Sequence, residues 1–377
     1  MAKIIIKNEE GSQLMYLAFL AYFTLYPKPW GRIDQNPLAK KAQMYFLRNG
    51  LDQEIKNFLD FCFLDFQNYI GESTITYFSL AYHNPQRKLS LFKFIKKNKP
   101  KIAPFFNQIY NACLKSLDSF KKSIENSSLQ KQIQKATQKD ILNKKSLLPD
   151  LKKVIKEDLE FFNAEEKVKE TVFIITPTNF FPYQFDAGSY FFGKEIIIIS
   201  SEPNNLNLIE HEFLHAFITP IVEKLLAKNF NLQKNVINLT SQKRKKTYGN
   251  IASHLLSEEL IYTYINNFKI KQTPSYDNFL KNYSFKSERE FQEFLKEHSG
   301  FQKRCQKLKI NNLHSFQKKS KLFFDTYEKN ILSEIIYQLY NHFQNKKENN
   351  PDLKFERFLF KYLKTGCFYF IASPLLS

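Results

Sequence analysis

The chain has 377 residues, which is enough for two or three packed units with sizeable cores. Apolar residues make up 43% of it and Phe occurs 39 times, whereas Gly and Pro occur only 9 and 14 times, so the composition excludes a disordered, collagen-like or turn-dense all-β chain and favours helices. The formal net charge is +19, and it comes from 49 Lys and only seven Arg. Lys recognises phosphates and bases less specifically than Arg, so no specific nucleic-acid partner is predicted.

Residues 1–165 are predicted to form a helical region. Its most apolar segment, Leu14–Tyr26, has 13 residues without a charge, which is too short to span a bilayer. Glu9 and Glu10 precede this segment where a signal peptide would carry basic residues, so a core helix is favoured over an export signal. We therefore expect a cytoplasmic protein without a transmembrane segment, with export through an atypical N-terminus as the alternative.

Helical spacing of apolar residues continues over Leu51–Ile70 and Ser90–Phe120, with a break near Pro100 and Pro104. Asn126–Lys145 is rich in Lys, Gln, Ser and Asn, and this composition predicts an exposed connection. The four cysteines form no C-x-x-C pair, so buried free thiols are expected rather than disulfides or a thiolate zinc site. They are Cys62, Cys113, Cys305 and Cys367.

Three short runs near the middle of the chain predict β-strands. Val172–Ile175 and Glu195–Ser200 are rich in β-branched residues, and Tyr190–Phe192 lies between them, followed by the turn Gly193-Lys194. We expect a small, mostly antiparallel sheet. The fold class is therefore α+β and predominantly helical.

A further helix follows this sheet. Asn204 or Asn205 can cap it, and Pro220 is expected to stop or kink it. Asn231–Asn250 is polar, and helical spacing resumes over Ile251–Phe268. Later helices are predicted at 287–297, 315–345 and 352–364. Together these features divide the chain into an N-terminal helical region (1–165), a central region with the sheet (166–270) and a C-terminal helical region (271–377).

One motif on the predicted central helix carries chemistry: His211-Glu212-Phe213-Leu214-His215, an H-E-x-x-H. Histidines four residues apart lie one turn apart on the same helix face, so both imidazoles can bind the same Zn²⁺. The adjacent Glu212 can reach a metal-bound water as a general base without being a ligand. The alternative is an amphipathic helix with two surface histidines.

A catalytic zinc needs a third protein ligand and keeps its fourth position for water. No H-x-x-G-x-x-H continuation follows His215, so we expect the third ligand downstream, where Ser253–Leu260 offers one His and two Glu. Glu258 shares an apolar stripe that faces the core, where a carboxylate needs a partner. We favour Glu258 over Glu259, which is rotated from it by about 100°, and over His254.

The segment His211–Lys224 resembles the active-site helix of an uncharacterised bacterial family of predicted zinc metallopeptidases, in which this helix typically reads H-E-F-S-H-x-F-x-N-P. Gly188 and Ser257-Glu258 match the family's upstream strand pair and its downstream Glu-bearing helix. The chain departs from the pattern at Leu214 for Ser, at Thr219 for Asn and at Tyr262 for Arg. The resemblance covers residues 171–268, and it implies a gluzincin-type peptidase whose zincin-like catalytic core is the central region, 166–270.

These observations predict a zinc hydrolase that cuts peptide bonds in a peptide or protein substrate, with one catalytic Zn²⁺ bound by His211, His215 and Glu258. Glu212 would take the proton of the metal-activated water and pass it to the leaving amine. The second donor to the oxyanion is left open among Tyr262, His254 and Tyr248.

The sheet edge at Gly188–Phe192 is the candidate for pairing with an extended substrate. Two other functions remain as alternatives. One is a zincin-fold binding or scaffold protein without turnover, and the other is a Lys-rich protein that binds nucleic acid or a membrane surface.

Overall fold

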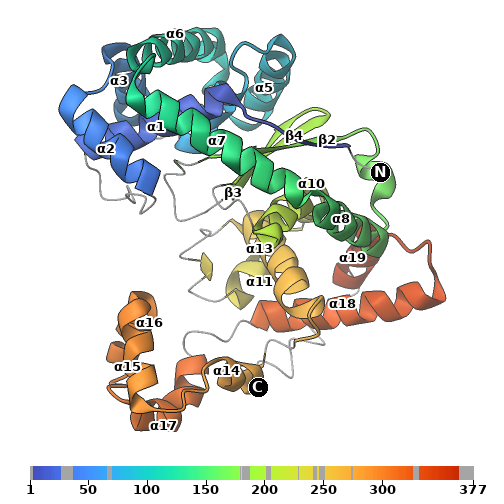
Figure 1. Ribbon diagram of the computed structural model, residues 1–377. Coiled ribbons are helices and arrows are strands. Elements are labelled where there is room, and N and C mark those ends of the chain that lie inside the picture. The colour runs from blue at the N-terminus through green and yellow to red at the C-terminus, as the bar shows by residue number, and fades with distance from the viewer. Residues whose placement is uncertain are drawn as a thin grey trace. The chain divides into compact units, whose positions relative to one another are not determined.

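The structure is a computed structural model, which describes residues 3–26, 37–65, 70–178, 180, 187–200, 205–227, 229–240, 244–245, 251–272, 275–325 and 331–364. It confirms a predominantly helical α+β fold with one small sheet (Figure 1). The chain divides into two compact units, which are Met1–Asp158 with Glu165–Phe213 and Leu159–Ala164 with Leu214–Ser377. The predicted regions 1–165, 166–270 and 271–377 stay a prediction.

The first unit contains the sheet and the N-terminal helices. Its strands are β1 (Lys3–Ile6), β2 (Val172–Pro177), β3 (Ala187–Phe192) and β4 (Glu195–Ser200). Its helices are α1 (Glu10–Leu25), α2 (Pro37–Asn49), α3 (Gln53–Asp60) with a π-helical turn (Phe61–Asp65), α4 (Glu72–Leu80), α5 (Pro85–Asn98), a 3₁₀ turn (Ala103–Phe105), α6 (Phe106–Ile124), α7 (Ser128–Ser146) and α9 (Glu165–Val168). Two helices continue into the second unit, α8 (Leu148–Phe162) and α10 (Leu206–Leu226).

The sheet is mixed, so the prediction of a mostly antiparallel sheet was wrong. Its strand order is β1-β2-β4-β3; β1 and β4 both run parallel to β2, and β3 runs antiparallel to β4. All four residues of Ile196–Ile199 in β4 are buried, which is typical of a parallel strand covered on both faces. The sequence prediction also missed β1, which reaches the sheet from the start of the chain.

Different helices cover the two faces of the sheet. Ile174, Tyr190 and Ile197 belong to the core that the sheet shares with α1 to α7. On the opposite face of the sheet, the ring of Phe173 in β2 packs against α10, with its centroid 4.7 Å from that of Phe213. The sheet therefore supports the first half of α10, which carries the H-E-x-x-H motif.

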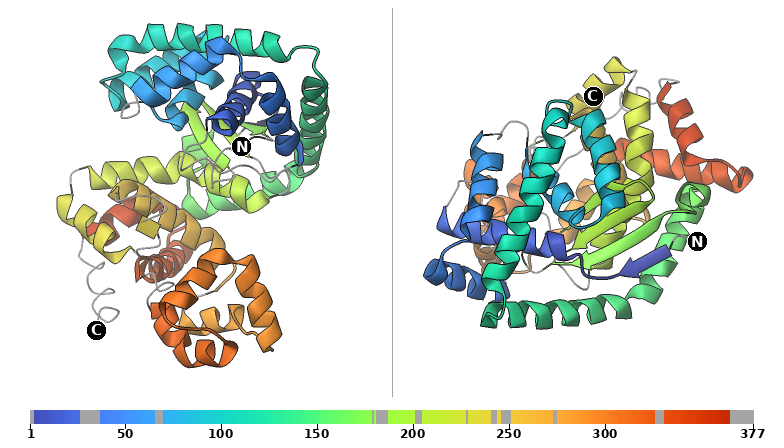
Figure 2. Two further views of the ribbon diagram at one scale, coloured as in Figure 1. Left: turned by 90° about the vertical axis from the view of Figure 1, so that its left-hand side faces the viewer. Right: turned by 90° about the horizontal axis from the view of Figure 1, so that it is seen from above.

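Residues 126–145, predicted as an exposed connection, form most of α7 instead. Leu129, Ile133 and Thr137 form a narrow buried stripe on this helix. Gln13 of α1 donates through Nε2 to Thr137 Oγ1 (3.0 Å) and to the Pro177 carbonyl oxygen (3.3 Å). Figure 2 shows α7 following the β1 and β2 side of the sheet. The stripe was too sparse to reveal helical spacing in so polar a sequence.

The helix α10 does not stop at Pro220, contrary to the prediction. Proline removes one N–H donor from a helix interior, and here it lies on the exposed side of α10. Phe217 and Ile218 before it, and Ile221 and Val222 after it, are all buried. Burial of this apolar face keeps the helix continuous through the proline.

The described residues of the second unit form helices joined by turns and short loops, without a strand. Its elements are α11 (Phe230–Leu239), α13 (Ala252–Thr263) with a π-helical turn (Tyr264–Phe268), α14 (Tyr276–Asn282), α15 (Glu288–Glu297), α16 (Ser299–Lys307), α17 (Leu313–Phe323), α18 (Ile331–Asn349) and α19 (Phe355–Lys364). The polar stretch 231–250 includes most of α11, and the predicted 315–345 helix is divided between α17 and α18. Tyr340 of α18 donates its hydroxyl to the Leu260 carbonyl of α13 (2.9 Å), so these two helices pack directly.

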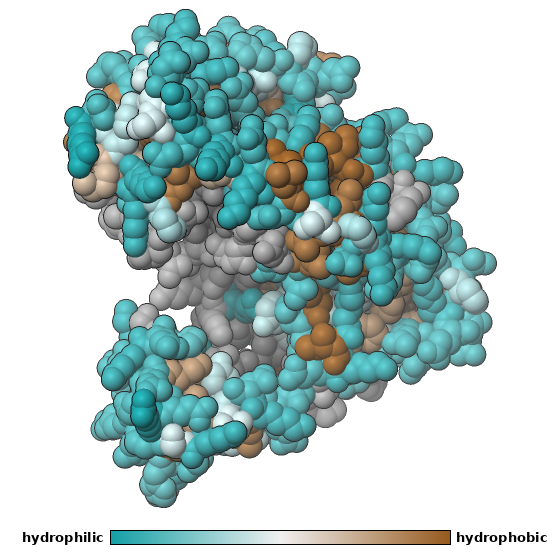
Figure 3. Space-filling view, in the orientation of Figure 1, coloured by the Kyte–Doolittle hydropathy of each residue, from teal (hydrophilic) through white to brown (hydrophobic). Residues whose placement is uncertain are grey.

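The expectations for the N-terminal apolar segment and for the cysteines can be compared with the structure directly. Leu14–Leu25 lies in α1, mostly buried, as a core helix. Among the described residues, no helix combines the length and apolarity needed to cross a membrane. Cys62, Cys113 and Cys305 are buried free thiols, as predicted, and Cys367 lies outside the described residues. The face shown in Figure 3 is largely hydrophilic, as expected for a Lys-rich surface.

Candidate metal centre

The H-E-x-x-H motif lies in the second and third turns of α10. Asn205 caps this helix, because its Oδ1 accepts a hydrogen bond from the backbone N–H of Leu208 (3.1 Å). The buried residues Phe213 and Leu214 hold the same stretch against its neighbours. His211 and His215 thus have a fixed helical spacing, and both side chains are half-buried.

The third predicted ligand, Glu258, lies on α13. It follows His215 by 43 positions in the sequence. Glu258 is only 7% exposed. Its Oε1 lies 3.3 Å from Nε2 of His215. One ligand atom from each of His211, His215 and Glu258 lies within 4.8 Å of the other two, so the structure brings the three predicted residues together.

The donor set and its spacing fit a tetrahedral zinc ion. Zinc binds His nitrogen and carboxylate oxygen at about 2.0–2.2 Å, so two ligands of a tetrahedral ion lie about 3.3–3.6 Å apart. The 3.3 Å between His215 and Glu258 has this value already. The separations that involve His211 are at most 4.8 Å.

The second ring nitrogen of His215 also has a partner. Its Nδ1 lies 2.9 Å from Oγ1 of Thr219, one turn further along α10. A proton on Nδ1, donated to this hydroxyl, leaves the Nε2 lone pair directed at the ligand cluster. Thr219 therefore fixes the ring orientation at the position where the resembling family has Asn.

The neighbouring Glu259 is also buried, at 1% exposure, so burial alone does not show which of the two carboxylates is the ligand. Its partners do. Arg244 Nε lies 2.8 Å from Glu259 Oε1, and Ser333 of α18 donates its hydroxyl to Oε2 (2.6 Å). These contacts direct Glu259 away from the histidines and into the packing of α13 against α18.

Arg244 was not identified from the sequence, where it stands in a run of four basic residues, 243–246. Its guanidinium also covers the ring of Tyr262, 3.8 Å from the ring centroid. One signal could have found it: Arg is scarce in this chain, and Arg suits buried ion pairs better than Lys. Lys243 and Lys246 lie outside the described residues.

The candidates for the oxyanion donor fall in different places. Tyr262 is 39% exposed and stacked under Arg244. Tyr248 lies outside the described residues. Nε2 of His254 lies 3.3 Å from Glu258 Oε1, so His254 is the candidate that contacts the ligand cluster.

The predicted general base, Glu212, lies on α10 between the two histidines and is half-buried. Its charge acts on Tyr190 of β3. Burial raises the pKa of Tyr190 to about 12, and the charges of Tyr77 and Glu212 add to this rise, whereas hydrogen bonds from Tyr16 and Thr76 oppose it.

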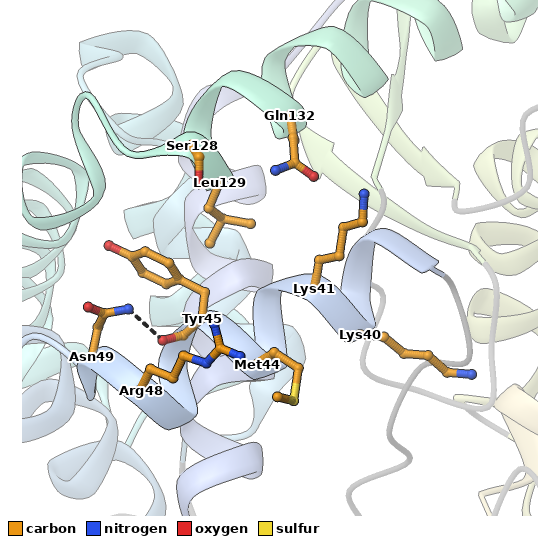
Figure 4. A pocket seen from close by; sticks show the side chains of 9 residues that line it. All are labelled: Lys40, Lys41, Met44, Tyr45, Arg48, Asn49, Ser128, Leu129 and Gln132. Atoms are coloured by element: carbon orange, nitrogen blue, oxygen red, sulfur yellow. Dashed lines mark hydrogen bonds between the residues drawn. The ribbon is translucent and has the colours of Figure 1, made fainter.

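A surface groove between α2 and α7 differs from the candidate metal centre in its lining, in which the charged side chains are all cations (Figure 4). Its volume is about 390 Å³, and its charged lining residues are the cations Lys40, Lys41 and Arg48. Lys41 extends toward Gln132, whereas Lys40 points away from it. The lining includes no carboxylate, imidazole or thiol, so this groove offers no general base and no zinc ligand set.

Comparisons of the chain with protein-family models, with curated proteins and with solved structures found no match. The resemblance of the α10 motif to a metallopeptidase helix therefore stays a prediction.

Proposed function

We propose that this protein is a zinc-dependent peptidase with a zincin-like core. The observation that carries the proposal is the clustering of His211, His215 and Glu258, whose ligand atoms lie within 4.8 Å of one another. Two of these residues flank a half-buried glutamate on a helix that packs on a small sheet. A protein that only bound zinc structurally would more often close the site with a fourth protein ligand.

A zinc ion bound by these three residues would lower the pKa of a coordinated water toward about 7 and polarise a peptide carbonyl. Glu212 supplies the remaining chemistry, because its carboxylate accepts the proton of the attacking water and passes it to the leaving amine. The position of Glu212 in the sequence of α10, directly after His211 and half-buried, supports this role.

The strand β3 supports a place for the substrate. Its only strand partner among the described residues is β4, so its other edge can accept an extended peptide. At one end this edge is occupied, because the backbone N–H of Phe191 donates to the hydroxyl of Tyr77 (3.2 Å). We propose that a peptide substrate pairs with the remaining part, around Ser189.

Replacing Glu212 by Gln tests the proposal. The wild-type protein with one equivalent of Zn²⁺ should hydrolyse members of a peptide library or casein, and Glu212→Gln should lower the rate by about 10²–10⁴ because general-base catalysis is lost. Its zinc content and melting temperature should match the wild type. Glu223→Gln, an exposed site on the same helix, is the matched control and should keep full activity.

Equal hydrolysis by the wild type and by Glu212→Gln would reject Glu212 as the base. A wild-type protein that binds zinc but hydrolyses none of these substrates would instead favour the scaffold alternative.

A further inference from the structure

His254 of α13 is a further residue that contacts the candidate metal centre. It lies one turn before Glu258 on the same helix, and its Nε2 is 3.3 Å from Glu258 Oε1. The same oxygen is 3.3 Å from Nε2 of His215. One carboxylate oxygen therefore lies between two imidazole nitrogens.

The two histidines cannot play the same part once a metal is bound. When His215 gives its Nε2 lone pair to a cation, that nitrogen carries no proton and cannot donate to Glu258. His254 is not one of the three residues whose ligand atoms cluster. Its Nε2 can carry a proton and donate it to Oε1, which lies 3.3 Å away.

We infer that His254 is a positioning residue, which holds the Glu258 carboxylate in its ligand orientation through a hydrogen bond from Nε2 to Oε1. This inference rests on the proposed metal site. A carboxylate ligand is commonly oriented by such an outer hydrogen bond, and losing the bond typically lowers metal affinity about 10–100-fold. The helical spacing of four residues sets this contact from the backbone, without a loop.

The position of the His254 side chain is consistent with this role. The side chain is 49% exposed, whereas that of Glu258 is 9% exposed, so the donor approaches the buried carboxylate from the solvent side. Glu259, the next residue, is oriented by Arg244 and Ser333 instead. Each of the two adjacent glutamates thus has its own orienting partner.

The affinity for Zn²⁺ alone is the direct test, measured on the full chain by competition with a chromophoric chelator. His254→Ala should weaken zinc binding about 10–100-fold. His254→Gln should restore most of the affinity, because the Gln amide can place an N–H close to the position of Nε2. His314→Ala on α17, another exposed histidine, should leave the affinity unchanged.

The visible spectrum of the Co²⁺-substituted protein separates positioning from direct ligation. A positioning role leaves the ligand-field bands of His254→Ala similar to those of the wild type at saturating metal, because the ligand set is retained. A change to the bands of a lower-coordinate site would show that His254 is itself a ligand, and would overturn the inference.

Wild-type zinc affinity in His254→Ala would also overturn the inference while leaving the metal site intact. Absence of zinc binding by the wild type would reject the proposed function and the inference with it. These outcomes distinguish failure of the inference from failure of the metal site.

Discussion

Nε2 of His215 on α10 and Oε1 of Glu258 on α13 lie 3.3 Å apart, although α11 lies between these two helices in the sequence. Two lone pairs at this distance repel each other unless a cation lies between them. A proton on Nε2 can fill that role, and so can a metal ion held by both atoms. The adjacent His211, one turn before His215 on α10, favours the metal because it adds a third donor.

Replacing the two adjacent glutamates of α13 should affect different properties of the protein, zinc binding for Glu258 and folding stability for Glu259. Glu258→Ala should remove zinc binding, because it deletes one of the three clustered ligand groups and two remaining ligands hold the ion poorly. Glu259→Ala should keep zinc binding but lower the free energy of unfolding by about 3–5 kcal/mol, because Arg244 is left without its buried partner. Metal analysis and urea unfolding of both variants check this.

The opposite result for the two glutamates, with zinc lost in Glu259→Ala and retained in Glu258→Ala, would mean that the ligand was assigned to the wrong carboxylate.

An ion triad centred on the buried Arg87 should stabilise the first unit. Arg87 of α5 contacts both Glu9 carboxylate oxygens (2.7 and 3.0 Å) and donates from Nε to Glu195 of β4 (2.7 Å). Burial alone would raise the pKa of Glu9, but the hydrogen bonds and charge of Arg87 lower it. Arg87→Ala leaves Glu9 without this partner and should cost about 3–5 kcal/mol of unfolding free energy.

Lys93→Ala, at an exposed position of the same helix, is the control for Arg87→Ala and should change stability by less than about 0.5 kcal/mol. Urea unfolding curves that coincide for the two variants would contradict the stabilising role of the triad.

Glu72 at the start of α4 should make stability depend on pH. Burial raises its pKa to about 8, from a model-compound value of 4.5. Between these values the folded protein keeps the proton and the unfolded chain releases it, so its contribution to stability falls as pH rises from about 5 to about 8. Glu72→Gln should remove this contribution and be more stable than the wild type at about pH 8.

The measurement is the difference in unfolding free energy between the wild type and Glu72→Gln across that pH range. A difference that stays constant with pH would show that Glu72 ionises normally in the folded protein.

Local patterns predicted the elements of the fold better than their assembly. The strands β2, β3 and β4, the core helix α1 and the helix of the metal motif were all expected from spacing and turn residues. The apolar run Ile196–Ile199 is typical of a parallel strand buried on both faces. The tight turn at Gly193-Lys194 indicates an antiparallel hairpin instead, and the prediction of a mostly antiparallel sheet followed from that turn. β1 could not be placed, because its pairing with β2 joins segments far apart in the sequence.

The candidate site shows the same limit. Helical spacing placed His211 beside His215, and the apolar stripe of α13 directed Glu258 inward. The stripe did not reveal that Glu259 is buried too, because its partners Arg244 and Ser333 come from an earlier segment and a later helix. Pairings of that kind depend on tertiary packing, which periodicity within one helix does not encode.

Zinc content per chain tests the central claim most directly. After purification and dialysis against Zn²⁺ at neutral pH, elemental analysis should find about one zinc in the wild type and in His314→Ala. Sharply reduced zinc is expected in His211→Ala and in His215→Ala, because two remaining protein ligands hold the ion poorly. Full zinc retention in both of these variants, at wild-type melting temperature, would contradict the metal centre.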